Sequence, residues 1–327
     1  MKRETQRERN TFPNSDSNKR YYTYDYYLRK TYGGKCAKVT LDAGFTCPNI
    51  DGTKGSGGCI YCSSRGSGDF SPEASLSLAE QYRIQVARIT EKWNTPRFIP
   101  YLQAHTNTYG DLSRLRATYR DALMLPGAVA LHIATRADCL GNGVLDILSE
   151  VADVLPLTVE LGLQTVRDDI ALFIGRGHSY EEFLDGYARL RARIPSARIA
   201  VHVINGLPKE TKEDMLKTVK EVAALAPDEV KIHLLHVLRG TRLATLYTEG
   251  SYIPMTREDY VDTVVEQLRL LPPDTVIGRL TGDGKAEDLL APIWSLKKLT
   301  VINDIDKKMV TNGFFQGDLF NLNKKST

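Results

Sequence analysis

The sequence predicts an α/β fold, an open and partial (βα)6 TIM-like barrel that is followed by a C-terminal extension. Three observations lead to this prediction. Apolar strand-like runs alternate six times with helical patterns between Lys38 and Leu271, and such alternation calls for a parallel sheet with right-handed crossovers. The 327 residues are 42% hydrophobic, enough for one barrel-sized domain, with or without an appendage. Pro272 and Pro273 then end the sixth helical pattern.

The six βα units can be placed in chain order from these patterns. The expected strands cover residues 38–43, 97–103, 128–134, 157–163, 198–204 and 229–235. The helices behind them are expected over residues 77–92, 112–123, 143–154, 180–194, 211–225 and 257–271. One more strand is expected over residues 276–280.

The domain organisation follows from the same boundaries. Residues 1–20 are polar with a single aromatic side chain, a composition that predicts a mobile N-terminal tail. Residues 21–271 form the predicted barrel, and residues 272–327 form an extension that packs on it. No internal repeat or low-complexity linker divides the chain.

Composition limits the class of protein. The net charge is only +3, so the whole molecule is not an obvious nucleic-acid binder, although residues 1–38 carry ten basic against four acidic residues. No apolar run approaches the ~18 residues that a membrane span needs, and the N-terminus lacks a signal-peptide pattern. Five cysteines, three of them needed as free thiolates, indicate a reducing compartment. We therefore expect a cytoplasmic protein without a membrane partner, and no obligate oligomer is evident.

Three cysteines carry the strongest chemical signal. Cys47, Cys59 and Cys62 have the spacing C-x11-C-x2-C around a glycine-rich loop that follows the first predicted strand. Three thiolates can bind three irons of a [4Fe–4S] cluster and leave the fourth iron open for a ligand that is not protein. The alternatives are a zinc knuckle and three incidental thiols. Zinc needs a fourth ligand, and the nearest histidine, His105, lies far along the chain. The remaining cysteines, at positions 36 and 139, are expected to be ordinary small buried residues.

Further candidate binding residues follow the predicted strands, because ligands of parallel α/β sheets bind at the carboxyl ends of the strands. They lie within or after the second, fourth, fifth and sixth strands and are Gln103, Thr106, Asn107, Glu160, Gln164, Arg176, Asn205, Gly206 and His233. Glu160 lies among apolar strand residues, where a lone carboxylate is unfavourable, so a ligand ammonium or a neighbouring basic side chain should accompany it. No strand is followed by G-x-G-x-x-G, which argues against dinucleotide binding.

These motifs resemble those of radical SAM enzymes. The cysteine loop has an aromatic residue, Tyr61, between its last two cysteines, as in that superfamily. Residues 160–165 and 203–211 resemble segments of the coproporphyrinogen-oxidase-like and elongator-like branch. Residues 42–53, 106–109 and 279–283 together are similar to YhcC-like bacterial radical SAM proteins over residues 20–320.

The resemblance implies a radical SAM barrel, a [4Fe–4S] cluster on the three cysteines and S-adenosylmethionine (SAM) on its open iron. One-electron reduction, with flavodoxin or ferredoxin as electron donor, then gives a 5′-deoxyadenosyl radical. The resemblance implies that the candidate residues above contact SAM. Arg176 is expected either to pair with the methionyl carboxylate of SAM or to face solvent. His233 is expected either to contact the ligand or to have a structural role. Members of this family are associated with maturation of wobble uridines in tRNA, so tRNA is the implied substrate.

Three functions remain open at this point. The first is a radical SAM enzyme that acts on tRNA, the second is a radical SAM enzyme that acts on a small metabolite, and the third is a non-enzymatic Fe–S or zinc protein. Residues 19–30 interleave basic groups with five tyrosines, a pattern that suits phosphates and unpaired bases. The same tyrosines could instead pack against one edge of the barrel.

Overall fold

A computed structural model describes residues 10–320 and confirms the predicted fold class. Its main element is a curled sheet of seven parallel strands in the order β1-β2-β3-β4-β5-β6-β8. The strands are β1 (Ala37–Leu41), β2 (Phe98–Leu102), β3 (Leu131–Thr135), β4 (Leu157–Gln164), β5 (Arg198–Asn205), β6 (Glu229–Leu234) and β8 (Val276–Arg279). The seventh strand is the one expected over residues 276–280, and it pairs with β6.

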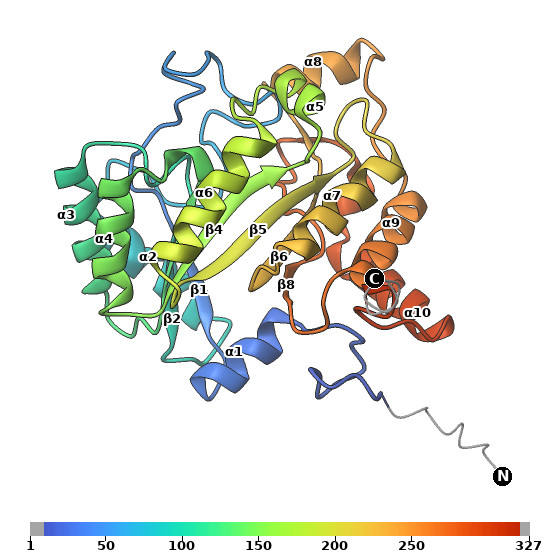
Figure 1. Ribbon diagram of the computed structural model, residues 1–327, viewed down its shortest axis with the longest axis horizontal. Coiled ribbons are helices and arrows are strands. Elements are labelled where there is room, and N and C mark those ends of the chain that lie inside the picture. The colour runs from blue at the N-terminus through green and yellow to red at the C-terminus, as the bar shows by residue number, and fades with distance from the viewer. Residues whose placement is uncertain (1–9, 321–327) are drawn as a thin grey trace.

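Helices cover the outer face of the sheet (Figure 1). Those behind the first six strands are α2 (Leu78–Thr90), α3 (Leu112–Leu123), α4 (Asn142–Ala152), α6 (Tyr180–Arg193), α7 (Lys212–Ala224) and α9 (Arg257–Leu270). Three of them begin with a capping box, in which the side chain of Ser77, Ser179 or Thr211 accepts from the third helical N–H. Such caps satisfy N–H groups that have no partner within the helix, and they explain why these boundaries could be predicted within a residue or two.

The remaining elements were not predicted. Near the carboxyl ends of the strands lie α5 (Asp168–Phe173) and α8 (Arg242–Thr248), with a short antiparallel pair of β7 (Val237–Leu238) and β9 (Leu289–Ala291). The helix α1 (Tyr24–Tyr32) precedes the first strand in the chain. The helix α10 (Lys298–Thr311) packs on α9. No helix within residues 10–320 has both the length and the apolar character that crossing a membrane requires.

Helix α1 lies at the amino end of the barrel. Figure 1 places α1 below the sheet and α5 and α8 above it. The Tyr24 hydroxyl lies 3.4 Å from His132 Nε2 on β3. The Arg198 guanidinium, at the start of β5, lies 4.0 Å from the centre of the Tyr27 ring. On β8, Ile277 N–H donates to Tyr22 O. The tyrosines of residues 19–30 therefore pack against the edge of the barrel opposite the cysteine loop.

The basic groups of residues 19–30 are largely paired within the protein. Lys19 forms an ion pair with Asp306, and Arg29 lies 2.6 Å from Asp16. The guanidinium of Arg20 lies 4.5 Å from the centre of the Phe315 ring. These contacts favour the packing interpretation of the segment over the nucleic-acid interpretation.

The part of the expected N-terminal tail that the structure describes, residues 10–20, packs on the C-terminal segment. Phe12 is buried, and its ring stacks on that of Phe315 with 6.4 Å between centroids. The Asn14 side chain donates to Pro273 O. Packing therefore begins before residue 21, contrary to the expectation of a mobile tail over residues 1–20, and residues 1–9 lie outside the described part.

Candidate active site

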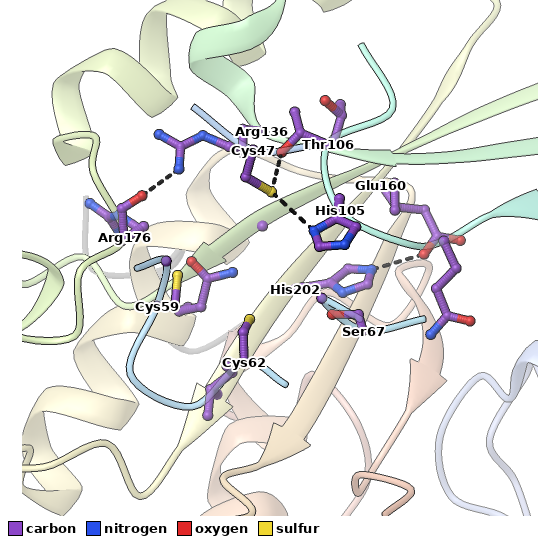
Figure 2. A pocket seen from close by; sticks show the side chains of 18 of the residues that line it. Cys47, Cys59, Cys62, Ser67, His105, Thr106, Arg136, Glu160, Arg176 and His202 are labelled. Atoms are coloured by element: carbon purple, nitrogen blue, oxygen red, sulfur yellow. Dashed lines mark hydrogen bonds and ion pairs between the residues drawn. The ribbon is translucent and has the colours of Figure 1, made fainter. Parts of the chain in front are cut away.

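A cavity of about 220 Å3 opens at the carboxyl end of the sheet, and Cys47, Cys59 and Cys62 all line it. Figure 2 shows the three sulfurs around one space, with Thr106, His105 and Arg136 beside them. The cysteines come from the loop that follows β1. The other lining residues come from the same loop, from the strands β2, β3, β4, β5, β6 and β8, and from the segments that follow β2, β3 and β4. The prediction of a site at this edge of the sheet therefore agrees with the geometry.

The loop that carries the cysteines is held by hydrogen bonds to the segment after β4. Asn49 Nδ2 donates to Gly175 O at 2.9 Å and lies 3.4 Å from Cys59 Sγ. Ile60 N–H donates to Ile174 O at 2.9 Å. Gly58 has φ +68°, a left-handed conformation that a side chain would disfavour. These contacts fix the direction of the loop and turn its thiols into the cavity.

The thiols differ in acidity because of their neighbours. The hydrogen bond from the Cys62 thiol, helped by those from Tyr61 and Asn49, lowers the pKa of Cys59 to about 6 against the opposing effect of burial. The same bond raises the pKa of Cys62. Burial raises the pKa of Cys47, although the hydroxyl of Thr106, 3.0 Å from its sulfur, opposes this. Since the thiolate is the form that binds metal, the hydrogen bond between Cys59 and Cys62 favours loss of one proton from this pair.

His105 is close to the cysteines in space, which its position in the sequence did not indicate. Its Nδ1 lies 3.9 Å from Cys47 Sγ, because the carboxyl ends of β1 and β2 are adjacent. The sequence distance of His105 from the cysteines therefore does not correspond to a distance in space. Within residues 10–320, however, no three or more His, Cys, Asp or Glu side chains are grouped so that they could hold a single metal ion.

Arg176 uses its donors within the protein. All five of its N–H groups are directed to acceptors, namely Leu163 O, Thr165 O, His178 O twice and Asp168 Oδ1, at 2.6–3.3 Å. The side chain is 2% exposed. An arginine has only five N–H donors, so neither alternative from the sequence, a methionyl carboxylate partner or a solvent-facing side chain, describes it. Arg176 instead connects the end of β4 to the turn before α6.

We expect Arg176→Ala to lower the free energy of unfolding by roughly 1–3 kcal/mol, because buried carbonyls lose their donors. SAM affinity of the folded variant should stay close to that of the wild type. Urea unfolding and equilibrium binding of SAM measure the two quantities. Arg193→Ala is the control, since Arg193 pairs with Asp146 on the surface and both side chains are more than half exposed. A variant that unfolds like wild type but binds SAM at least tenfold more weakly would contradict this assignment.

Arg136 is the cation that the sequence analysis missed. It follows β3, lines the cavity and lowers the pKa of Cys59. Its Nε and Nη2 donate to Asp138 at 3.0 and 2.9 Å, and its Nη1 donates to Arg176 O. Lys54 also pairs with Asp138, at 2.8 Å. The only sequence signal for Arg136 is its place directly after a predicted strand.

Glu160 has protein partners for its charge. Lys38, Lys231, His132 and His202, from β1, β6, β3 and β5, all contact its carboxylate, whose side chain is fully buried. Of the two alternatives for this residue, a ligand ammonium or basic neighbours, the structure supplies the neighbours. An ionised carboxylate only accepts hydrogen bonds, so His132 donates through Nδ1 at 2.7 Å and His202 donates through Nε2 at 2.9 Å.

The charges around Glu160 follow from burial and from these contacts. Burial alone would raise the pKa of Glu160, but Lys231, Lys38 and the two histidine bonds hold it well below its ordinary value. Burial, together with the nearby lysines, lowers the pKa of His132 to about 3 and that of His202 to about 4. At neutral pH the carboxylate is therefore ionised and both imidazoles are neutral.

The other candidates divide into two groups. Gln103, Thr106, Gln164 and His233 line the cavity together with Glu160 and Arg176. Asn107, Asn205 and Gly206 are not among its lining residues.

The residues outside the lining have structural partners. The two N–H groups of Asn107 Nδ2 are shared among three backbone carbonyl oxygens at 3.0 Å each, among them Leu102 O and Ala134 O. Asn205 and Gln267 on α9 exchange a pair of amide hydrogen bonds at 2.8 Å. The predicted contacts of these two side chains with SAM therefore do not agree with the geometry.

The comparisons with known proteins agree with this site. Residues 51–222 match the profile described as Radical SAM superfamily, and residues 227–311 match the one described as Radical_SAM C-terminal domain. YtqA of Bacillus subtilis (strain 168) is 42% identical over 311 residues, which cover 95% of this chain and 96% of that protein. YhcC of Escherichia coli (strain K12) is 34% identical and covers 88% of this chain and 91% of that protein.

Two further proteins are more distant. The tRNA uridine(34) acetyltransferase of Methanocaldococcus jannaschii is 29% identical over 47% of this chain and 28% of that protein. The structure of archaeal Methanocaldococcus infernus Elp3 superposes with a TM-score of 0.65 at 19% identity, covering 86% of this chain and 64% of that one. The likeness to that structure concerns the fold alone.

A parallel half-barrel with three cysteines in one cavity at its carboxyl end, together with these matches, defines the class: the chain belongs to the radical SAM superfamily of enzymes. Within that superfamily it is a member of the YtqA/YhcC family.

Proposed function

We propose that this chain is a radical SAM enzyme that modifies the side chain of a wobble uridine in tRNA. The observation that carries the chemistry is the convergence of three thiols on one cavity at the carboxyl end of the sheet. The proposed tRNA substrate is supported by the similarity of this chain to the protein named tRNA uridine(34) acetyltransferase.

The residues present fit an iron–sulfur cluster. Cys47, Cys59 and Cys62 are soft thiol ligands that face a common space, and such ligands suit iron–sulfur clusters. When bound there, a [4Fe–4S] cluster with SAM supplies a one-electron reductive cleavage of the sulfonium that yields a 5′-deoxyadenosyl radical. The buried carboxylate of Glu160, neutralised by its basic neighbours, holds the walls of the cavity in place.

Three lining residues remain proposed SAM contacts. Gln103, Thr106 and Gln164 border the same space as the thiols. His233 also lines this space, and a contact with the substrate is proposed for it below. Gln164 has φ +64°, a left-handed conformation that is uncommon for a residue with a side chain and often marks a functional position. We add Arg136 to this set, because it is a cation beside the thiols and suits the methionyl carboxylate.

Two conditions of the reaction follow from the same chemistry. Free thiolates need a reducing compartment, so we place the enzyme in the cytoplasm. Flavodoxin or ferredoxin is the proposed electron donor, because the cleavage requires one electron that SAM does not supply.

The test uses two measurements. Anaerobically reconstituted protein should release 5′-deoxyadenosine when given dithionite and SAM, and a non-enzymatic Fe–S protein should not. Mass spectrometry of tRNA nucleosides from a deletion strain should show loss of a modified wobble uridine and accumulation of its precursor. Wild-type chain should restore the nucleoside, and the chain with Cys59→Ala should not. An unchanged nucleoside profile alongside active SAM cleavage would replace tRNA with a small metabolite as substrate.

A further inference from the structure

One part of the cavity is lined by side chains that lie within the strands. Tyr101 on β2, His202 on β5, Lys231 and His233 on β6, and Arg279 on β8 line it. None of these residues belongs to the cysteine loop or to the segments that hold it. We call the part of the cavity that these five residues line its inner end.

The inner end is polar, but its charges are matched inside the protein. Lys231 pairs with Glu160, as does Lys38 from β1. Arg279 pairs with Asp283 at 2.7 Å. Burial lowers the pKa of His202 to about 4 and holds that of His233 well below its ordinary value, so both rings are neutral. The surface therefore offers hydrogen-bond donors and acceptors rather than a free charge.

The two histidine rings are stacked on each other, and one of their nitrogen atoms has no hydrogen-bond partner among the described residues. Their rings stack with 5.0 Å between centroids and 27° between planes. His202 is fixed by its bond to Glu160. His233 Nε2 is shielded from solvent, and no hydrogen-bond partner for it is present among the described residues. A buried ring nitrogen without a partner is unfavourable, and a ligand that reaches the inner end would supply one.

We propose that the inner end binds a single unpaired nucleobase and that His233 Nε2 contacts the hydrogen-bonding edge of that base. A nucleobase is planar and uncharged and carries donors and acceptors on its edge, as this surface requires. A base inside a duplex cannot enter, because enzymes that act on a base must take it out of the stack. The inference rests on the proposed function and names the part of the RNA that the cavity receives.

A double-mutant cycle tests the contact. Full-length protein, reconstituted with iron and sulfide and given SAM, is titrated against a synthetic anticodon stem-loop that has either a uridine or an abasic site at the wobble position. Fluorescence anisotropy gives the dissociation constants. We expect removal of the base, or His233→Ala, to weaken binding roughly tenfold. In the His233→Ala protein, removal of the base should change affinity less than about twofold, because the contact is already lost.

His236→Ala is the matched control. His236 Nε2 is also buried without a partner, but the ring lies against Gly282 and Gly284 and does not line the cavity. The full effect of base removal should persist in this variant. His233→Asn keeps a hydrogen-bond donor and an acceptor, so it should recover part of the affinity for the stem-loop. It replaces His233→Ala in the cycle if the alanine variant is unfolded at the temperature of the assay.

The outcomes separate the two proposals. Equal effects of base removal in wild type and His233→Ala, with the stem-loop bound by both, would overturn the contact and leave the tRNA proposal intact. Absence of any stem-loop binding by wild-type protein would overturn both, and the nucleoside analysis of the deletion strain would check that result independently.

Discussion

Cys59→Ala is expected to abolish both cluster assembly and SAM cleavage. Three thiols face one cavity, and within the described residues no further cysteine lines it, so loss of one thiolate leaves at most two cluster ligands. The hydrogen bond with Cys62 lowers the pKa of Cys59 to about 6. Removal of the Cys59 sulfur would also remove this hydrogen bond from Cys62. Iron and sulfide should fall toward zero per chain, and 5′-deoxyadenosine should not form.

The control for this experiment is the Cys36→Ala/Cys139→Ala double variant. Cys36 lies 3.6 Å from Gly34 O before β1, and Cys139 lies beside Asp138 after β3; neither lines the cavity with the other three cysteines. Its iron and sulfide content should remain about four of each per chain. Retention of SAM cleavage by Cys59→Ala, or loss of the cluster in the double variant, would show that the ligands are assigned wrongly.

Glu160→Gln is expected to lower the free energy of unfolding by about 3–5 kcal/mol, because it leaves Lys38 and Lys231 near a neutral group in the barrel interior. The carboxylate is fully buried and also accepts from two histidines. Urea unfolding at neutral pH measures the loss. Glu150→Gln is the matched control, since Glu150 pairs with Arg116 at 2.9 Å with side chains 55% and 45% exposed, and should cost less than about 1 kcal/mol.

The same ion cluster predicts a dependence on pH. The folded-state pKa of Glu160 is held well below its ordinary value of 4.5, so its contribution is complete above the unfolded pKa. It is lost as pH falls below about 4.5 toward the folded pKa. The stability difference between wild type and Glu160→Gln should therefore shrink in acid. A difference that is small at neutral pH, or that grows in acid, would contradict the assignment of Glu160 as a stabilising anion.

Much of the barrel could be predicted because its signals are local. The β4 strand, expected over residues 157–163, is Leu157–Gln164, and the helix expected over residues 112–123 is α3 (Leu112–Leu123). Apolar periodicity and capping side chains depend on neighbours in the sequence. The α1 helix was missed because its stability depends on contacts with β3, β5 and β8 that follow it in the chain.

The candidate site was only partly predictable. The C-x11-C-x2-C spacing by itself determined the three cysteines, because one loop carries all of them. Only the tertiary structure decided the partners of the other groups: Glu160 meets lysines 122 residues before and 71 residues after it, and His105 meets Cys47 across 58 residues. Parallel strands bring such distant residues side by side, and a buried charge or donor takes whichever partner the neighbouring strand supplies.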